Sequence, residues 1–429
     1  MLGGMSRLDE FLTKVRTGFT RTFWVANTIE LFERFAYYGS KAILTVYVAE
    51  QVGLGPEKAG WLVGSLFNTL LYFLPVFAGT IVDRFGFRRS LTLCFAVFSL
   101  GYFLIGLAGL PAGKPLVDAL GPTNYMVLAL IVTAAGGSLI KPSIVGTVAR
   151  TTNAQTKSLG YSIYYTLVNL GGAIGPLLAS VVRQNVGISY VLMMSAGTTF
   201  ALLVATLLFY GEPARPVDAG PPKSMAKVFL DMLMVLKDLR FISFLVIFSG
   251  FWAMFWQIFY SLPFYVRDYL HYERFEVIET VDAWTIIVVT VPLAALAARL
   301  RPITAMVLGF ALSSVSWFVM GWFPTTMMTV VAIVIYALGE GLQAPRYYEY
   351  VADLAPKDQV GTYMGYAFLP VAIGTFIAGA IAGKLVTAYV PHGGDVSNAP
   401  RMWFIVGFIG VGTTVLMVLY DRLVARRVA

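Results

Sequence analysis

Long apolar stretches dominate the sequence and limit what it can fold into. A membrane-spanning helix needs about 20 mostly apolar residues, and a spanning segment must close its backbone hydrogen bonds internally, which favours helices. Twelve stretches meet this requirement: residues 23–50, 58–82, 88–109, 124–149, 157–182, 187–210, 241–270, 280–299, 303–323, 326–354, 359–389 and 402–424. Of the 429 residues, 58% are hydrophobic and only 13% are charged, too few charges for the surface of a soluble protein. We therefore expect an all-α, multi-pass membrane protein.

The twelve predicted spans fall into two sets of six, separated by a polar segment. The front of this segment, "YGEPARPVDAGPPK", is rich in Pro and Gly and indicates a flexible linker. Its rear, residues 224–240, has the pattern of an amphipathic helix lying on the membrane surface. The predicted organisation is an N-terminal segment (1–22), a six-helix bundle (23–210), a linker (211–240), a second six-helix bundle (241–424) and a tail (425–429).

Basic residues predict the orientation in the membrane, because Lys and Arg accumulate in cytoplasmic loops. One set of loops and tails is rich in them: Arg84, Arg88, Arg89, Arg150, Lys157, Arg215, Lys223, Lys227, Lys237, Arg240, Arg299, Arg301, Lys357, Arg422, Arg426 and Arg427. The opposite loops carry fewer: Lys58, Lys114, Arg183, Arg267, Arg274 and Arg401. We expect both termini in the cytoplasm. The net charge of +8 then needs no nucleic-acid partner.

A motif at the end of the second predicted span points to a transporter fold. "GTIVDRFGFRRS", residues 79–90, resembles the G-x-x-x-D-R-x-G-R-R loop signature of the major facilitator superfamily. In this interpretation Asp83 caps or pairs with a neighbouring helix end and Arg84 lies at the lipid headgroups. The alternative is an ordinary basic loop. The resemblance implies the major facilitator fold, twelve helices in two bundles, with a substrate site between them.

A polar stripe runs along the first predicted span. Its members are spaced i, i+3, i+4, i+7, i+8 and i+11 and so share one helix face: Glu30, Glu33, Arg34, Tyr37, Tyr38 and Lys41. A charge at mid-bilayer costs about 2.5–3.5 kcal/mol even on lenient scales. We therefore expect the stripe to face a cavity. The alternative is a purely structural ion-pair cluster that joins two helices.

Most of the polar stripe lies within the segment "ELFERFAYYG", residues 30–39. This segment has every fixed position of the pattern E-x-x-E-R-F-x-Y-Y-G and so resembles a family within that superfamily, the proton-dependent oligopeptide transporters. "GGSLIKPSIVG", "YSIYYTLVNLG", "FSGFWAMFWQ" and "ALGEGLQAPRYYEYVADLAP" resemble its segments on helices 4, 5, 7 and 10. These four segments supply Lys141, Tyr165, Asn169, Trp252, Gln257 and Glu340.

The resemblance implies a role for each of these residues. Glu30, Glu33 and Arg34 are the expected proton-coupling group. The expected substrate-binding residues are Tyr37, Tyr38, Lys41, Lys141, Tyr165, Asn169, Trp252, Gln257, Asp282 and Glu340. Basic groups in the first bundle and acids in the second suit a zwitterion, with its carboxylate toward the first and its amine toward the second.

The chain departs from the family pattern at positions that line the family's binding site. Phe67 stands where a tyrosine is usual, and Ala367 where a tryptophan is usual. Trp256 replaces an acid that can pair with the last basic residue of the stripe, which is Lys41 in place of an arginine. Asp282 replaces an asparagine. These changes bear on the identity of the substrate more than on the fold.

Three further expectations concern single residues or pairs, and two of them have alternatives. Lys141 is expected in the cavity with Glu340 as its counter-charge, but a lysine near a helix end can also extend to the membrane surface. Asp282 is expected in the cavity or else as a solvated residue at a helix start. Arg346 and Glu349, at i and i+3, are expected to form a structural pair near the inner side, as a gating or structural contact.

The predicted function is proton-coupled symport that imports di- and tripeptides or peptide-like zwitterions by alternating access, in a bacterial inner membrane and as a monomer. The alternatives are a proton-coupled exporter of drugs or peptide-like metabolites, a membrane enzyme, and a sensor that does not transport. The sequence offers no nucleophile–base constellation for an enzyme and no phosphate-binding loop. Cys94, His271 and His392 give no metal-ligand cluster. We expect no cofactor other than the coupling proton.

Overall fold

The computed structural model describes residues 17–153, 155–214, 224–356 and 360–425, and all regular elements in these ranges are helices. The elements of the first half are α2 (Arg21–Val46), η1 (Tyr47–Gln51), α3 (Gly55–Gly60), η2 (Trp61–Asn68), α4 (Thr69–Phe73), α5 (Pro75–Phe85), α6 (Phe87–Ala108), η3 (Pro111–Gly113), α7 (Lys114–Leu120), α8 (Pro122–Gly137), α9 (Ile140–Thr151), α10 (Lys157–Asn185) and α11 (Ile188–Phe209). Those of the second half are α12 (Met225–Val235), α13 (Leu239–Phe255), α14 (Gln257–Tyr260), α15 (Leu262–Phe264), η4 (Tyr265–Tyr269), α16 (Phe275–Ala297), α17 (Pro302–Trp322), α18 (Thr326–Leu354), α19 (Val360–Tyr366), α20 (Leu369–Tyr389) and α21 (Arg401–Leu423).

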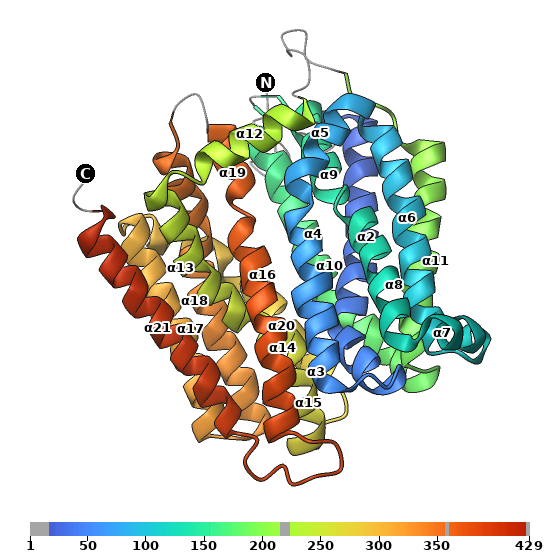
Figure 1. Ribbon diagram of the computed structural model, residues 1–429. Helices are drawn as coiled ribbons and strands as arrows, with labels where there is room; N and C mark the ends of the chain where they lie inside the picture. The colour runs from blue at the N-terminus through green and yellow to red at the C-terminus, as the bar shows by residue number, and fades with distance from the viewer. Residues whose placement is uncertain (1–16, 154, 215–223, 357–359, 426–429) are drawn as a thin grey trace, which may run out of the picture.

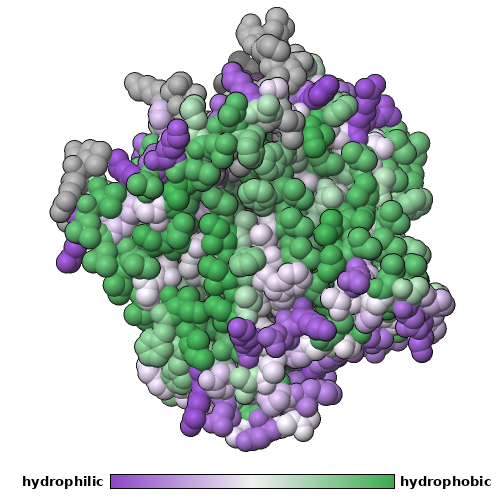
Figure 2. Space-filling model, viewed as in Figure 1, coloured by the Kyte–Doolittle hydropathy of each residue, from purple (hydrophilic) through white to green (hydrophobic). Residues whose placement is uncertain are grey.

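The helices of the two halves form two bundles that stand side by side (Figure 1). The start of α2 and the end of α21 lie toward the same end of the molecule, and α12 crosses that end. The surface carries a band of apolar side chains between two hydrophilic ends (Figure 2), which is the pattern of a chain embedded in a bilayer. Several charged loop residues used above to predict orientation (Arg215, Lys223, Lys357, Arg426 and Arg427) and most of the segment 1–22 lie outside the described residues.

Eleven helical segments in the described residues are long and apolar enough to cross a membrane. The first predicted span is not among them, because α2 carries the charged stripe that includes Glu30, Glu33 and Arg34. Nevertheless α2 packs against α10 and α11 within the first bundle, and these three charged side chains are buried there. The first predicted span is thus a helix, α2, whose apolar character is interrupted by its polar stripe.

Four predicted spans are interrupted by short breaks that we did not predict. The second breaks between α4 and α5 just before Pro75, and the fourth between α8 and α9 just before Pro142. The seventh breaks between α13 and η4 around Pro263, and the eleventh between α19 and α20 just before Pro370. Proline cannot donate a backbone hydrogen bond and disfavours helical geometry in the residue before it. Such breaks are tolerated inside a membrane where protein or a cavity satisfies the freed backbone groups.

The bundles touch most closely at the end opposite the termini, which we call the closed end. There α3 and η2 of the first bundle pack against α20 of the second through Gly60, Gly64, Gly379 and Gly383. A Cβ atom added at Gly60 would lie 2.5 Å from the carbonyl oxygen of Gly379. The absence of side chains therefore permits this contact between the two backbones.

We predict that Gly379→Ala destabilises the closed end by about 1–3 kcal/mol, since an added methyl overpacks a tight contact. The measurement is thermal unfolding of purified protein. Gly412→Ala on α21 is the matched control, because a Cβ there would meet nothing within 4 Å. Equal melting temperatures for the two variants would contradict the assignment of Gly379 to a tight interface.

Candidate functional site

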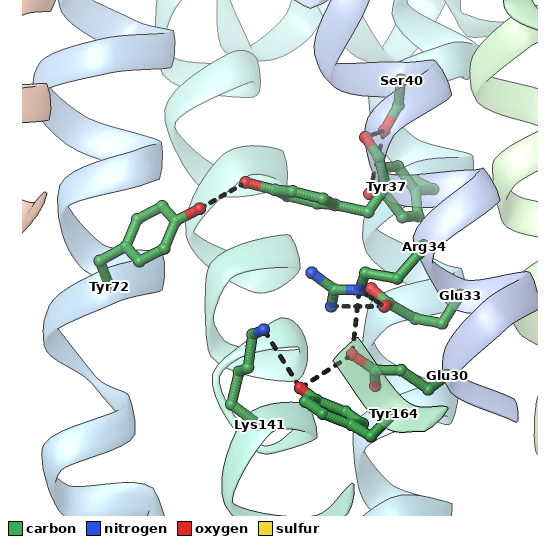
Figure 3. A network of polar contacts seen from close by, with 9 residues as sticks. Glu30, Glu33, Arg34, Tyr37, Ser40, Tyr72, Lys141 and Tyr164 are labelled. Atoms are coloured by element: carbon green, nitrogen blue, oxygen red, sulfur yellow. Dashed lines mark hydrogen bonds and ion pairs between the residues drawn. The ribbon is translucent and has the colours of Figure 1, made fainter. Parts of the chain in front are cut away.

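The first bundle buries an ion-pair cluster formed by α2. Glu30, Glu33 and Arg34 expose 0%, 1% and 6% of their surface. Arg34 pairs with both acids: its Nε lies 3.3 Å from Glu30 Oε1 and donates to Glu33 Oε2 at 2.5 Å (Figure 3). One guanidinium thus balances two buried carboxylates.

Helix α10 fixes the position of this cluster. Gly171 of α10 lies directly against Arg34, where an added Cβ would overlap the Cβ of the arginine. From the same helix, the Tyr164 hydroxyl donates to Glu30 Oε1 at 3.4 Å and accepts a bond from Lys141 Nζ at 3.3 Å. Figure 3 shows the resulting chain from Lys141 through Tyr164 and Glu30 to Arg34. Sequence analysis missed Tyr164 and named only its neighbour Tyr165 as a site residue.

A small cavity of about 40 Å³ adjoins this cluster, lined by Glu33, Arg34, Tyr37, Leu71, Tyr72, Pro75, Phe98, Gly137, Lys141 and Phe368. Phe368 comes from the second bundle, so the cavity lies between the two. The hydroxyls of Tyr37 and Tyr72 are 3.1 Å apart (Figure 3). Tyr72, which we did not predict, thereby brings a phenol to the cavity, whereas Phe67 is buried in the core.

A second, larger cavity of about 270 Å³ lies between α10, α16 and α18. Its lining consists of Tyr165, Ile286, Thr290, Ala294, Glu340, Gly341, Ala344, Pro345 and Tyr348. The carboxylate of Glu340 contributes charge here, and its Oε2 has no hydrogen-bond partner among the described residues. Tyr165 is half-exposed and accepts at its carbonyl a bond of 2.8 Å from the Asn169 side chain.

Helix α16 begins earlier than predicted and carries an acid that we did not predict. We expected this span to start at residue 280, but α16 starts at Phe275. Asp282 is therefore its eighth residue, and Asp282 Oδ1 is buried without a partner in the described structure. The alternative of a solvated helix-start residue is wrong. Glu279, one turn earlier, is 3% exposed.

Lys41 lies against aromatic rings of the second bundle. Its Nζ is 3.5 Å from the ring centroid of Phe259, 4.1 Å from that of Trp256 and 5.2 Å from that of Phe255. Lys41 forms no ion pair within the described part of the chain. Cation–π contacts of this kind can contribute about 2 kcal/mol when desolvated. In this chain the aromatic contacts thus surround the Lys41 ammonium where the family pattern offers an acid at position 256.

The expected pairing of Lys141 with Glu340 is not what the structure shows. Lys141 donates to Tyr164, and the charged groups that act on it are Arg34, Glu30 and Glu33. The charge of Glu340 acts instead on Lys41 and Asp282. Lys141 is separated from Glu340 because its side chain is held by α10 within the first bundle.

Trp252 and Gln257 hold α20 in this conformation. The Gln257 amide donates to the carbonyls of Ala253 at 3.3 Å and Ala378 at 3.2 Å, and its Oε1 accepts from Ser261 at 2.6 Å. Trp252 packs against Gly374, where an added Cβ would overlap the Trp252 side chain. Their expected contact with substrate stays a prediction.

The residues expected in gating or structural roles lie toward the end that carries the termini. Asp83 lies 3.5 Å from Arg150 at the end of α9, while Arg84 is exposed beside Phe85. Arg346 pairs with Glu349, and its Nη2 also donates to the Leu300 carbonyl at 2.6 Å. Their roles in gating remain predictions.

Two ion pairs connect the bundles at the closed end. Arg267 of η4 donates to Glu50 of η1 at 2.7 and 2.5 Å, and Arg183 of α10 pairs with Glu276 of α16. The sequence identifies Arg183 and Arg267 only as loop charges. Their partners lie at least 90 residues away in sequence, so only the fold could identify these pairs.

Comparison with known proteins places this fold in a family. A family model of the Major Facilitator Superfamily matches residues 28–379 and 274–428. The chain belongs to the major facilitator superfamily. A Multidrug resistance protein MdtH of Photorhabdus laumondii is 24% identical over 374 residues, which are 86% of this chain and 87% of that protein.

Peptide transporters match over part of their length. A Dipeptide and tripeptide permease B of Shigella dysenteriae is 30% identical over 188 residues, 43% of this chain and 36% of the permease. A Di-/tripeptide transporter of Lactococcus lactis is 25% identical over 240 residues, 52% of this chain and 45% of that transporter. The chain therefore matches less than half the length of these two relatives.

Solved structures with the same fold cover nearly the whole chain. A POT family transporter in complex with 5-aminolevulinic acid has a TM-score of 0.75 at 18% identity, covering 94% of this chain and 97% of the other. Another POT family transporter, in complex with a thioalcohol-conjugated peptide, has a TM-score of 0.76 at 17% identity, with coverages of 94% and 96%. At these identities the likeness establishes the major facilitator fold.

We predict that Arg34→Gln lowers the free energy of unfolding by about 3–5 kcal/mol, since it leaves two buried acids without their cation. Thermal and denaturant unfolding of the purified protein measure this. The triple variant Glu30→Gln/Glu33→Gln/Arg34→Gln should recover much of the loss, because it removes all three charges. A harmless Arg34→Gln would show that the acids carry no charge in the resting protein.

Proposed function

We propose that this protein is a proton-coupled symporter that imports small peptides or peptide-like zwitterions by alternating access. The observation that carries the proposal is the distribution of buried charge across the two bundles. Arg34 and Lys141 of the first bundle line one cavity between the bundles, and Glu340 of the second bundle lines the other. A zwitterion has the complementary polarity, and the peptide permeases among the relatives support this substrate class.

In this mechanism the substrate carboxylate binds toward Lys141 and Arg34, and the substrate amine binds toward Glu340. Glu33 and Glu30 are the proposed proton carriers. When Glu33 takes a proton it no longer attracts the Arg34 guanidinium as an anion, so Arg34 becomes available to a substrate carboxylate. Proton and substrate binding are coupled because they share this arginine.

The closed end corresponds to the outer side of the membrane in this proposal, since we place both termini in the cytoplasm. The glycine contacts, the Glu50–Arg267 pair and the Arg183–Glu276 pair then form the outer gate. Import requires these contacts to separate so that substrate enters from outside. We propose the bacterial inner membrane as the location, in line with the bacterial relatives.

A second candidate is proton-coupled export of drugs or peptide-like metabolites. The observation favouring it is the match to a protein named for multidrug resistance, which spans most of both chains. Uptake of peptide into proteoliposomes under an acid-outside gradient supports import. Export predicts that cells expressing the protein resist toxic compounds and do not accumulate peptide.

We expect a monomer that needs no cofactor besides the coupling proton. A crystal structure of tetrameric PepTSo2 shares the fold, with a TM-score of 0.73 at 20% identity. Light scattering of the purified protein distinguishes these states. The family consists of transporters, and we propose no catalytic activity for this member.

We predict that Glu33→Gln abolishes proton-driven accumulation of peptide while substrate exchange across the membrane continues. The amide keeps the shape of a protonated carboxyl but carries no proton. Uptake and counterflow are measured in proteoliposomes, with Asp118→Asn, an exposed acid of α7, as the control. Continued accumulation by Glu33→Gln would remove Glu33 from the coupling mechanism.

We predict that Asp282→Asn weakens binding of lysine- or arginine-containing peptides and spares neutral ones, whereas Glu340→Gln weakens both. The reason is that Asp282 adds a second acid to the side proposed to bind the amine. A thermal-shift series measures it, because a ligand at one hundred times its Kd adds about 2.7 kcal/mol of stability. A uniform shift of the pH optimum for all peptides would instead make Asp282 a proton carrier.

A further inference from the structure

Glu279 is a buried acid that the proposed mechanism does not use. It is 3% exposed, and neither of its carboxylate oxygens has a hydrogen-bond partner among the described residues. Glu276, one turn before it on α16, is also fully buried but is paired with Arg183. Of these two acids on one helix face, only Glu276 forms an ion pair in the described part of the chain.

The helices packed against α16 bring few charged groups near Glu279. From α10, Arg183 is committed to Glu276 and to the Glu273 carbonyl. From α2, Lys41 is the remaining cation whose charge acts on Glu279. The other titratable groups of this region are Asp282 on α16, Glu340 and Tyr336 on α18, and Tyr165 on α10. These add no further cation.

Lys41 does not neutralise Glu279 in this conformation. Its ammonium lies against Phe259 and Trp256 and forms no ion pair in the described ranges. A buried carboxylate without hydrogen bonds or a paired cation costs several kcal/mol, and such a group is normally found neutral. The geometry therefore favours a protonated Glu279 when the closed end is shut.

We propose that Glu279 is a second proton-binding site, located in the second bundle, and that Lys41 is the cation that displaces its proton. When the Lys41 ammonium leaves the aromatic rings and pairs with Glu279, the carboxylic acid becomes a carboxylate and one proton is released to water. Lys41 remains protonated throughout, so charge and atoms balance. The reverse movement takes up one proton.

The position of Glu279 suits this role. Glu276, Glu279 and Asp282 are spaced i, i+3 and i+6 along α16 and run from the closed end toward Glu340. Glu276 belongs to an ion pair that bridges the bundles, so separation of the bundles there brings water toward Glu279. Lys41 lies on the first bundle and its aromatic contacts on the second. Movement of one bundle against the other therefore changes the environment of both groups.

Infrared spectroscopy of purified protein tests proton binding without any substrate. The C=O stretching band of protonated carboxylic acids should be weaker in Glu279→Gln than in wild-type protein, because Glu279 contributes one of the protonated acids. Glu57→Gln, an exposed acid at the same end, should keep the band. Lys41→Met leaves Glu279 in place but removes the cation. In this variant the contribution of Glu279 to the band should persist at an alkaline pH at which wild-type protein has lost that contribution. An unchanged spectrum in Glu279→Gln, or the same loss with pH in Lys41→Met, overturns the proposal.

The role in transport rests on the proposed function and has its own measurement. In proteoliposomes, the number of protons moved per substrate should fall by one in Glu279→Gln, and Glu57→Gln should match wild type. An unchanged ratio overturns the coupling role. If wild-type protein accumulates no peptide, the proposed function fails, while the infrared result still decides whether Glu279 holds a proton.

Discussion

The attraction between Arg34 and two neighbouring acids is the interaction on which the site depends. Buried charges are tolerated only when they are paired or neutralised, and Arg34 pairs with both Glu30 and Glu33. This requirement explains why α10 approaches α2 through Gly171, and why Tyr164 supplies a hydroxyl to Glu30. Protonation of one acid in this cluster changes the net charge around Arg34 and therefore the electrostatic attraction that every member feels. Such sensitivity is what a proton-coupled mechanism needs.

The two bundles handle buried charge in different ways. In the first, the acids have a guanidinium and a phenol as partners. In the second, oxygens of Glu279, Asp282 and Glu340 lack partners in the described structure, and the nearest uncommitted cation, Lys41, rests on aromatic rings. In the first bundle Glu30 Oε2 also lacks a hydrogen-bond partner among the described residues, but both acids lie within ion-pair distance of Arg34. The second leaves acids that gain stability from a proton, from Lys41 or from the amine of a substrate, so the occupant can change during a cycle.

Much of the fold follows from the sequence because long apolar segments have few options in a membrane. The twelve predicted spans, the division into two bundles and the superfamily motif were all available from residue order. The breaks near Pro75, Pro142, Pro263 and Pro370 were less predictable, because apolar residues continue through them. The start of α16 was placed too late, since Glu276 and Glu279 resemble loop residues until Arg183 and the packing of α10 are known.

The sequence by itself determined the polar stripe of α2, because helical periodicity places Glu30, Glu33 and Arg34 on one face whatever surrounds them. It also identified Lys141 and Glu340 as charges inside apolar segments. Only the tertiary structure decided the partners: Lys141 with Tyr164, and Lys41 with Phe259 and Trp256. It alone showed that Glu279 is buried and has no hydrogen-bond partner among the residues that the structure describes. Periodicity acts along one helix, whereas an ion pair or its absence depends on which side chains of other helices come within a few ångströms.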